Sequence, residues 1–487
     1  MKYLTSVLLF ALSCNIMVAQ GFQNEIIYDT EFHSGVKRCL EDNEQNIIIA
    51  GYTKDTAYHY IGFMMKVGPG FDTVLRIVEN DTADILFSDM LITPENNYFV
   101  IGGIGHDTGF NRNLDKVAIF IFDEGLNIIT EKMYQMPEEY NYPQLFLWQA
   151  ENGNVYAAGK RGNGYSELIL LKFDQNGNLL LSSYPNLINS SIHCISEKPN
   201  NPSSFYAYGH GMPYYSMARM EIDANLNYTV LPLEADGDYG SFNRDATAKW
   251  LNDSVFLFSS LVSTDTVLPY AYTDNILIKF SEGLEPSDEY LTVGMAQTVD
   301  YGFSYNIDWK TPEKMFVATY DAYPSSGQYR YFVALFNENL DVLGAKTISG
   351  GEDIDYSLHQ ICATSDGGII CSGTTRTSSS EEYDWDPFVH KITAEEIVQV
   401  SEKTTNPFDS DYFVYPNPGQ GTLNILTARK EAIVQFYGQN GECVFTEIFD
   451  NTLKNTINTS KLPDGIYILR FVDEKGYSES IKWIKEQ

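Results

Sequence analysis

The sequence is poor in positive charge. Its 487 residues contain 32 Lys and Arg against 65 Asp and Glu, which gives a formal net charge of −33. A field of that sign repels the phosphates of nucleic acids and anionic lipid headgroups, so we expect neither as a partner. Cationic partners or divalent ions are compatible with the charge, but an acidic, soluble surface is the interpretation that we favour.

The sequence also lacks a hydrophobic run of transmembrane length. The apolar stretch at residues 4–12, which follows Lys2, is shorter than the ~20 residues that a spanning helix needs. With the small residues before Gln20, it predicts that residues 1–20 are a signal peptide. A lipoprotein signal ending at Cys14 is an alternative that fits the residues poorly. We therefore expect an exported protein with no transmembrane segment.

Cysteine is scarce. Without Cys14 the chain keeps an odd number of cysteines, which gives no disulfide framework: Cys39, Cys194, Cys362, Cys371 and Cys443. If Asp366 and Gly367 form a two-residue hairpin turn, Cys362 and Cys371 face each other in a non-hydrogen-bonded pair and could be bridged. Two buried thiols are the alternative, and we favour it.

Familiar catalytic motifs are absent as well. The sequence contains no G-x-S-x-G, P-loop or H-E-x-x-H pattern, and its histidines lack metal-ligand spacing. Residues 174–178 (DQNGN) begin like a calcium loop, but the glycine comes one position early and Pro185 stands where the bidentate glutamate should be. We expect no cofactor, and the balance is against an enzyme.

What the sequence does contain is a recurring unit of about 54 residues. Its clearest copy, residues 152–183, has the pattern of strand, loop, strand, tight turn and strand. The small residue that ends the first strong strand recurs at Gly51, Gly102, Gly159, Gly209, Ser259, Thr319 and Gly373. A second strand that ends in a turn former follows each of them, and a further apolar stretch lies between units. Each unit therefore has four strands.

Four-stranded units with this period are typical of β-propeller blades. We predict an all-β protein with a seven-bladed β-propeller over residues 21–400. The ring must close on itself. Residues 25–29 (EIIYD) could supply the outermost strand of the seventh blade, and residues 397–400 compete for that role.

Loop lengths suggest which end of the propeller carries function. In an up-and-down blade, the tight turns gather at one end, which we expect to be inert. The longer connections gather at the other, at residues 53–60, 104–115, 234–245, 261–275, 349–356 and 374–387. Long loops on a rigid scaffold are where binding sites are built.

Acidic and tyrosine residues also collect at the end with the long connections. The candidate ligand face comprises Tyr142, Tyr239, Tyr301, Asp355 and Tyr356. Tyrosine can stack on a sugar, and carboxylates can accept its hydrogen bonds or act as an acid and base. The alternative, which we favour, is that aspartate serves turns and that tyrosine wedges between blades.

The chain ends in a different pattern. Residues 401–412 are polar and aperiodic, as in a linker. Short alternating strands then restart, which predicts a small β-sandwich over residues 413–487.

This terminal segment carries several short motifs. They are Tyr415, Pro416, Asn417 and Pro418 with Gly421, the turn Asn440-Gly441, the pair Gly465 and Tyr467, and a basic end at residues 482–485. The segment resembles the type A C-terminal sorting domain of the Bacteroidota type IX secretion system. One departure is Gly438-Gln439, where the family usually has Asp-Leu. The resemblance implies the type IX machinery as a partner, export across the outer membrane, removal of the tail, and release or attachment to surface lipopolysaccharide.

The leading hypothesis is therefore a secreted or surface-displayed propeller that acts as a binding or adhesion module for a polysaccharide or protein ligand. The alternative is a secreted carbohydrate-active enzyme, a hydrolase or lyase, with its site at the mouth of the propeller channel. A third possibility is a structural component of the cell surface.

Overall fold

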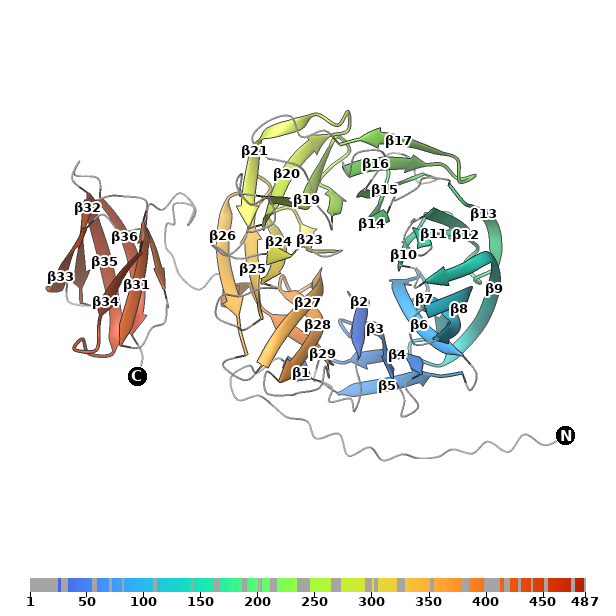
Figure 1. Cartoon of the computed structure of the whole chain (residues 1–487), viewed down its shortest axis with the longest axis horizontal. Helices are drawn as coiled ribbons and strands as arrows, with labels where there is room; N and C mark the ends of the chain where they lie inside the picture. The colour runs from blue at the N-terminus through green and yellow to red at the C-terminus, as the bar shows by residue number, and fades with distance from the viewer. Residues whose placement is uncertain are drawn as a thin grey trace. The chain divides into compact units, whose positions relative to one another are not determined.

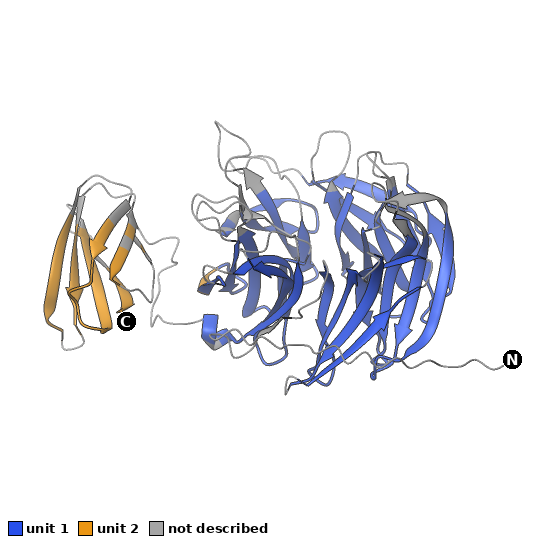
Figure 2. Cartoon of the chain, turned by 60° about the horizontal axis from the view of Figure 1, so that its bottom comes forward, with its two compact units in different colours: residues 1–340, 345–397 blue, residues 341–344, 398–487 orange. Residues whose placement is uncertain are grey.

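The computed structural model describes residues 25–27, 34–54, 59–69, 72–80, 83–107, 112–141, 144–161, 167–185, 191–199, 201, 204–210, 217–233, 246–263, 273–293, 300–301, 305–321, 329–350, 354–377, 385–397, 412–415, 421–427, 431–438, 441–450, 454–473 and 478–485. The predicted signal peptide and residues 401–411 of the predicted linker lie outside these ranges. The chain divides into two compact units (Figure 2). Unit 1 comprises residues 1–340 and 345–397, and unit 2 comprises residues 341–344 and 398–487. Within the described ranges, no helix is long and apolar enough to cross a membrane.

Unit 1 is made of β-sheets whose strands follow one another in chain order. The first three sheets are β2 (Gly35–Glu41), β3 (Ile47–Lys54), β4 (Tyr60–Val67) and β5 (Thr73–Val78); β6 (Asp84–Ile92), β7 (Tyr98–Asp107), β8 (Arg112–Phe122) and β9 (Ile128–Asn141); and β10 (Gln144–Gln149), β11 (Val155–Arg161), β12 (Glu167–Phe173) and β13 (Leu179–Ser183). The next two are β14 (Ser191–Glu197), β15 (Phe205–His210), β16 (Met217–Ile222) and β17 (Tyr228–Pro232); and β18 (Thr247–Trp250), β19 (Val255–Ser263), β20 (Thr273–Ser281) and β21 (Pro286–Val293).

Two further sheets complete the unit. In one, β22 (Asp300–Tyr301) and β23 (Ile307–Thr311) both pair with β24 (Lys314–Asp321), which is followed by β25 (Arg330–Phe336) and β26 (Val342–Ile348). The other contains β27 (Ile354–Ala363), β28 (Ile369–Thr377) and β29 (Asp386–Ile392). Figure 1 shows the sheets arranged around one axis, with β2, β10 and β14 nearest the centre and β5, β13 and β17 at the rim. Unit 1 is therefore an all-β, β-propeller-like fold.

The last sheet takes its fourth strand from the beginning of the chain. Strand β1 (Glu25–Ile27) pairs antiparallel with β29, with Ile26 opposite Val389. Ile397, the first residue of the competing segment, ends the short helix α1 (Ala394–Ile397), and residues 398–400 lie outside the described ranges. Residues 25–27 of the predicted segment 25–29 therefore supply the closing strand, and residues 28 and 29 lie outside the described ranges.

Both faces of the inner strands are buried, because each sheet packs between two others. In β3, Ile47 and Ile49 join a core with Cys362 and Ile370 of the last sheet. The alternate residues, Ile48 and Ala50, join a second core with Phe87 and Phe120 of the next sheet. Since successive side chains of a strand point to opposite faces, a strand buried on both faces reads as a continuous apolar run.

The recurring small residue has a packing reason in several sheets. A Cβ added at the glycine would lie 1.8–2.5 Å from a carbonyl oxygen of the neighbouring first strand: 2.4 Å for Gly51, 2.5 Å for Gly102, 1.8 Å for Gly209 and 2.0 Å for Gly373. In each of these sheets the pairing register of the first strand shifts directly after the residue opposite the glycine. A β-bulge of this kind brings two backbones close together, so only glycine fits.

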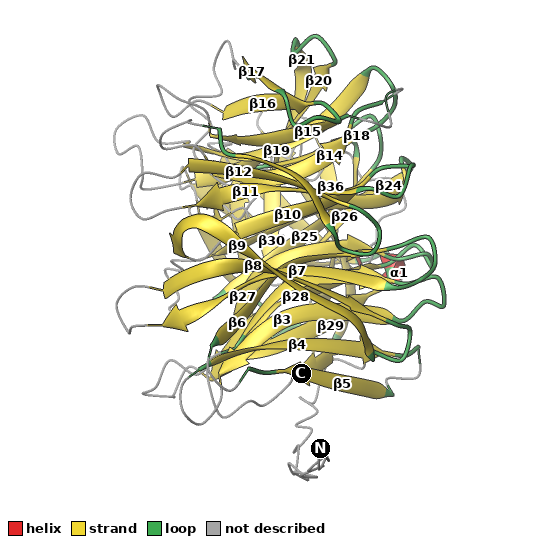
Figure 3. Cartoon of the chain, turned by 90° about the vertical axis from the view of Figure 1, so that its right-hand side faces the viewer, coloured by secondary structure: helices red, strands yellow, loops and turns green. Residues whose placement is uncertain are grey.

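Many of the tight turns share one five-residue pattern. In residues 123–127, the Asp123 amide donates to the Asn127 carbonyl at 3.0 Å and the Leu126 amide donates to the Asp123 carbonyl at 2.9 Å. The Asp123 carboxylate also accepts from the backbone amides of Gly125 and Asn127. The carboxylate of Asp174, the first residue of the calcium-like loop, accepts the corresponding hydrogen bonds from the backbone amides of Asn176 and Asn178. Figure 3 shows the described turns gathered along one end of unit 1, as the repeat pattern predicted.

Cys362 and Cys371 are not directly opposite each other on neighbouring strands. Cys362 lies opposite Ile370, and Cys371 lies opposite Ile361. The reason is the turn, which spans residues 364–368 rather than two residues and shifts the register by one position. The two side chains therefore point to opposite faces of the sheet, and both are buried, unbridged thiols. The disulfide alternative is wrong, and the interpretation as two buried thiols is confirmed.

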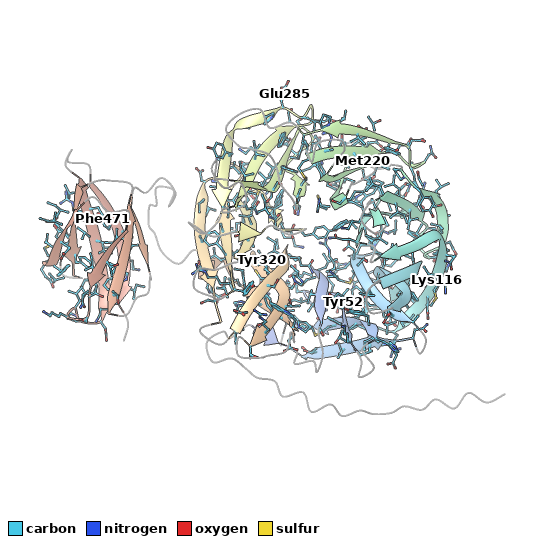
Figure 4. The ribbon with its side chains drawn as sticks, in the orientation of Figure 1. Tyr52, Lys116, Met220, Glu285, Tyr320 and Phe471 are labelled. Carbon is cyan, nitrogen blue, oxygen red and sulfur yellow. The ribbon has the colours of Figure 1, made fainter. Side chains whose placement is uncertain are left out.

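Unit 2 consists of two antiparallel sheets around one core. One contains β30 (Tyr412–Tyr415), β31 (Thr422–Thr427) and β34 (Lys454–Asn458), and the other contains β33 (Cys443–Asp450), β32 (Glu431–Tyr437), β35 (Gly465–Asp473) and β36 (Ser478–Lys485). Both sheets contribute to the core, with Leu423 from one and Phe436, Phe471 and Trp483 from the other. Figure 4 labels Phe471 inside this unit.

Candidate functional site in the central channel

One innermost strand of unit 1 is interrupted. Strands β22 and β23 pair with the two ends of β24, and Tyr305 and Asn306 lie in the break between them. The Tyr305 backbone has a φ of +61°, a left-handed conformation that is uncommon for a bulky residue. Its carbonyl accepts a hydrogen bond from the Ile361 amide of β27 at 3.1 Å. The break therefore sends the Tyr305 side chain out of its own sheet.

The Tyr305 side chain reaches residues of three other sheets. Its hydroxyl donates to Asp89 Oδ2 of β6 at 2.8 Å. The Arg38 guanidinium of β2 lies 3.5 Å from the centroid of its ring, and the Phe146 ring of β10 packs edge-on at 5.8 Å. Arg38 Nε also forms an ion pair with Asp89 Oδ1 at 3.3 Å. Tyr305 thus links innermost strands from different sides of the ring.

The Asp89 carboxylate is fully committed to this network. It is 1% exposed, and it also accepts hydrogen bonds from the backbone amides of Met90 at 2.8 Å and Leu147 at 2.7 Å. Burial raises the pKa of Asp89, against the opposing effect of the Arg38 charge. Burial and the nearby Asp89 charge raise the pKa of Tyr305 well above its usual value, so the phenol stays protonated and can donate.

Next to this network lies a cavity of about 250 Å³. Tyr305, Arg38 and Asp308 form part of its wall, together with two indole rings, those of Trp148 and Trp250. The wall positions lie on innermost strands, mostly in the part of each strand that leads into the following tight turn. The cavity is therefore in the channel and toward the tight-turn end.

A second ion pair lies on the wall of this cavity. Lys249 Nζ is 2.5 Å from Asp308 Oδ1 and also donates to the Trp309 carbonyl at 2.8 Å. Asp308 Oδ2 accepts from the Ala363 amide at 2.7 Å. These contacts connect β18, β23 and β27 across the inner circumference of the ring. The arrangement provides opposite charges and aromatic faces around a small space, which is the chemistry of a site for a small polar ligand.

The ligand-face candidates occupy different environments. Asp355 is 2% exposed, and its carboxylate accepts from the Tyr329 amide and pairs with Arg376 Nε, both at 3.0 Å. Tyr356 is 1% exposed and packs against Tyr331 and Phe388 with ring centroids 5.7 and 5.0 Å away. In this conformation both side chains belong to the packed scaffold.

The other three candidates cannot be placed against the cavity by their side chains. The backbone of Tyr301 lies in β22, while its side chain, like the whole of Tyr142 and Tyr239, is outside the described part of the chain. Most residues of the long connections are outside it too. The structure therefore describes a cavity at the tight-turn end, which we had expected to be inert. A ligand site at the long-loop end stays a prediction.

Sequence reasoning missed the channel residues, although a signal was present. Arg38, Asp89, Lys249 and Asp308 are charged residues inside short strands, each next to buried apolar residues. Charged residues are rarely buried unless they are paired. Their recurrence in the first strand of several units could have indicated a polar channel, whereas nothing in the sequence pairs Tyr305 with Asp89.

The sorting-motif residues lie partly within the described chain. Tyr415 ends β30, Pro416, Asn417, Pro418 and Asn440 lie outside the described residues, and Gly421 and Gly441 have φ values of +62° and +80°. Gly465 begins β35, and the hydroxyl of the buried Tyr467 donates to the Pro463 carbonyl at 2.6 Å. The residues that can be placed therefore serve turns and the core of unit 2.

Comparison with known families identifies the end of the chain. Residues 413–486 match the family described as the secretion system C-terminal sorting domain. This match supports a type IX sorting domain, and hence export to a secreted or cell-surface destination. No curated protein matches the chain.

Solved structures resemble this chain only distantly. A protein of unknown function from Dyadobacter fermentans has 10% identity and a TM-score of 0.45, over 76% of this chain and 98% of that one. The β-propeller domain of the trilobed protease from Pyrococcus furiosus has 8% identity and a TM-score of 0.41, over 77% and 99%. A mutant NanB sialidase from Streptococcus pneumoniae has 9% identity and a TM-score of 0.41, over 77% and 71%. Likeness at this level assigns no activity.

Proposed function

We propose that this is a secreted or surface-displayed seven-bladed β-propeller that binds a glycan or protein ligand and reaches its destination by type IX secretion. The proposed domains are a signal peptide (1–20), the propeller (21–400), a linker (401–412) and a β-sandwich sorting domain (413–487). The family match at residues 413–486 is the observation that carries the export half of the proposal.

The binding half rests on the channel. A closed ring of sheets is a rigid frame, because β1 from the start of the chain pairs with β29 near the end of unit 1. The cavity in that frame has charged and aromatic walls, a combination suited to recognising a polar molecule. Within the described residues, no group of three or more His, Cys, Asp or Glu side chains could hold a metal ion.

Export is tested by deleting residues 413–487. The truncated protein should accumulate in the periplasm, while the full chain reaches the surface or the medium. Unaltered delivery of the truncated protein would refute the sorting role. Binding is tested by screening the full mature chain against polysaccharides and surface proteins, with product analysis alongside. Binding without turnover supports the proposal, and bond cleavage would favour the alternative of a carbohydrate-active enzyme.

A further inference from the structure

The cavity at the tight-turn end of the channel has features that define a ligand class. We propose that it binds one neutral, hydroxyl-rich ring of hexose size, either free or as a terminal unit of a glycan. This inference rests on the proposed binding function and adds to it the location of the site and the chemistry of the ligand.

The charges on the cavity wall disfavour a strongly charged ligand. Arg38 is paired with Asp89, and Lys249 is paired with Asp308, so both cations are already neutralised. Glu197 is the fourth charged residue of the wall, and its exposed carboxylate has no hydrogen bond or ion pair to any residue in the described part of the chain. The charges of the lining residues cancel, and Asp89 behind Arg38 brings the sum of the five groups to −1, so an anion gains no net attraction, while a cation would have to approach Arg38 and Lys249.

A hydroxyl group suits this mixture because it can donate and accept. Glu197 offers an acceptor with unused capacity. Lys249 has three N–H donors, and two of them are directed to Asp308 and to the Trp309 carbonyl. The remaining donor of Lys249 and the carboxylate of Glu197 can therefore share the hydroxyls of a polyol.

Two indole rings supply flat apolar surface. Trp148 is half-buried and packs against Tyr156 and Phe205 with ring centroids 5.4 and 5.3 Å away. Trp250 is stacked on Tyr206 at 5.4 Å. Because rings behind them hold both indoles in place, they are rigid platforms, and the C–H face of a sugar ring is a suitable partner for such a platform.

The volume of the cavity limits the size of the ligand. The cavity of about 250 Å³ lies just below the roughly 300–1,000 Å³ that is usual for sites of drug-sized ligands. Tyr305, fixed by Asp89 and Arg38, forms part of its wall. One sugar ring is therefore a better match than an extended oligosaccharide.

The experiment uses the full mature chain and two readouts, calorimetry and tryptophan fluorescence. The probes are glucose, galactose, mannose, rhamnose and N-acetylglucosamine, with glucuronate as an anionic and choline as a cationic comparison. At least one neutral sugar should bind with a Kd below about 10 mM and change the tryptophan emission, and glucuronate and choline should bind at least about tenfold more weakly.

Glu197→Gln keeps the shape of the side chain and should lower the affinity for the sugar by about tenfold, because a charged acceptor becomes a neutral amide. Glu285→Gln is the matched control, since Glu285 is exposed and lies at the outer rim of unit 1 in Figure 4. Trp148→Phe, which keeps a ring, should weaken binding and reduce the emission change.

The inference would be overturned if no neutral sugar binds, or if the Glu197 and Glu285 variants bind the sugar with equal affinity. Tighter binding of glucuronate or choline would do the same. If a polysaccharide or protein still binds with Glu197→Gln unaffected, the proposed binding function stands and only this site is wrong.

Discussion

The hydroxyl of Tyr305 donates a 2.8 Å hydrogen bond to the carboxylate of Asp89, a residue 216 positions earlier in the chain. The bond crosses from the interrupted inner strand of one sheet to the inner strand of another. It holds a tyrosine with a left-handed backbone against a buried carboxylate and a guanidinium. Since strained residues persist only where their surroundings hold them, this network is expected to be a fixed part of the channel.

Tyr305→Phe should therefore destabilise unit 1 by about 1–3 kcal/mol, because it removes a hydrogen bond to a buried carboxylate and keeps the ring. Urea unfolding of the full chain measures the change. Tyr228→Phe is the control, since Tyr228 is 38% exposed on β17 and should tolerate the change with no measurable loss. Equal stability of the two variants would show that the Asp89 bond contributes nothing.

Glycine substitutions at the fourth position of two tight turns should change the stability in opposite directions. Gln45 and Leu126 have nearly the same φ, +64° and +60°, but Gln45 is exposed and Leu126 is 1% exposed. Gln45→Gly should stabilise the protein by up to ~1 kcal/mol, because glycine adopts a positive φ without steric cost. Leu126→Gly should destabilise it by about 1–3 kcal/mol, because the lost burial outweighs the same relief. Thermal unfolding distinguishes the two, and a shift of the same sign in both would contradict the argument.

We expect the protein to lose stability in mild acid because of the buried His390. Burial lowers the pKa of this histidine to about 4, and the Lys346 charge adds to the effect. The folded state therefore keeps His390 neutral while the unfolded chain binds a proton below its ordinary pKa of about 6.5. The free energy of unfolding should fall as the pH drops from about 6.5 to about 4, by about 3 kcal/mol from this residue.

The matched variant for this pH dependence is His390→Gln, which removes the titrating group and keeps a polar side chain beside the Tyr331 hydroxyl, 2.8 Å from the histidine. Its unfolding free energy should decline less between pH 6.5 and pH 4 than that of the unmodified protein. Parallel curves over this range would exclude His390 as the cause.

Closure of the ring can be tested at β1. A chain that begins at residue 31 lacks the strand that pairs with β29, and it should be less stable than a chain that begins at residue 22 by about 1–3 kcal/mol, from lost backbone hydrogen bonds. Ile26→Pro in the longer chain removes one donor and should give an intermediate loss. Identical melting temperatures for all three would mean that the pairing of Ile26 with Val389 does not stabilise the ring.

Trp483 should control the sorting unit. It is fully buried against Phe436 and Tyr467, with ring centroids 6.0 and 5.7 Å away. Trp483→Ala should cost about 3–5 kcal/mol, enough to unfold a domain of this size, and delivery to the cell surface should fall with it. Ile448→Ala removes a side chain that is 71% exposed and should leave delivery unchanged. Normal export of the Trp483 variant would separate sorting from the folded tail.

The sequence by itself determined the features that repeat locally. Strand runs such as Ile47–Lys54, turns such as that of Asp123 and Leu126, and the bulge-facing glycines each depend on a few neighbouring residues, so a period of about 54 residues displays them repeatedly. A candidate closing strand within residues 25–29 followed from the same repeat pattern. The tail was visible through its own short motifs.

Only the tertiary structure decided what meets in the channel. Tyr305, Asp89 and Arg38 come from three different sheets, and no local pattern joins residues 216 or more positions apart. The five-residue turn at 364–368 shifted the register by one and separated Cys362 from Cys371, a change too small to read from spacing. The cavity likewise lies toward the end with the tight turns, because the side chains of the inner strands, rather than the lengths of the loops, form its walls.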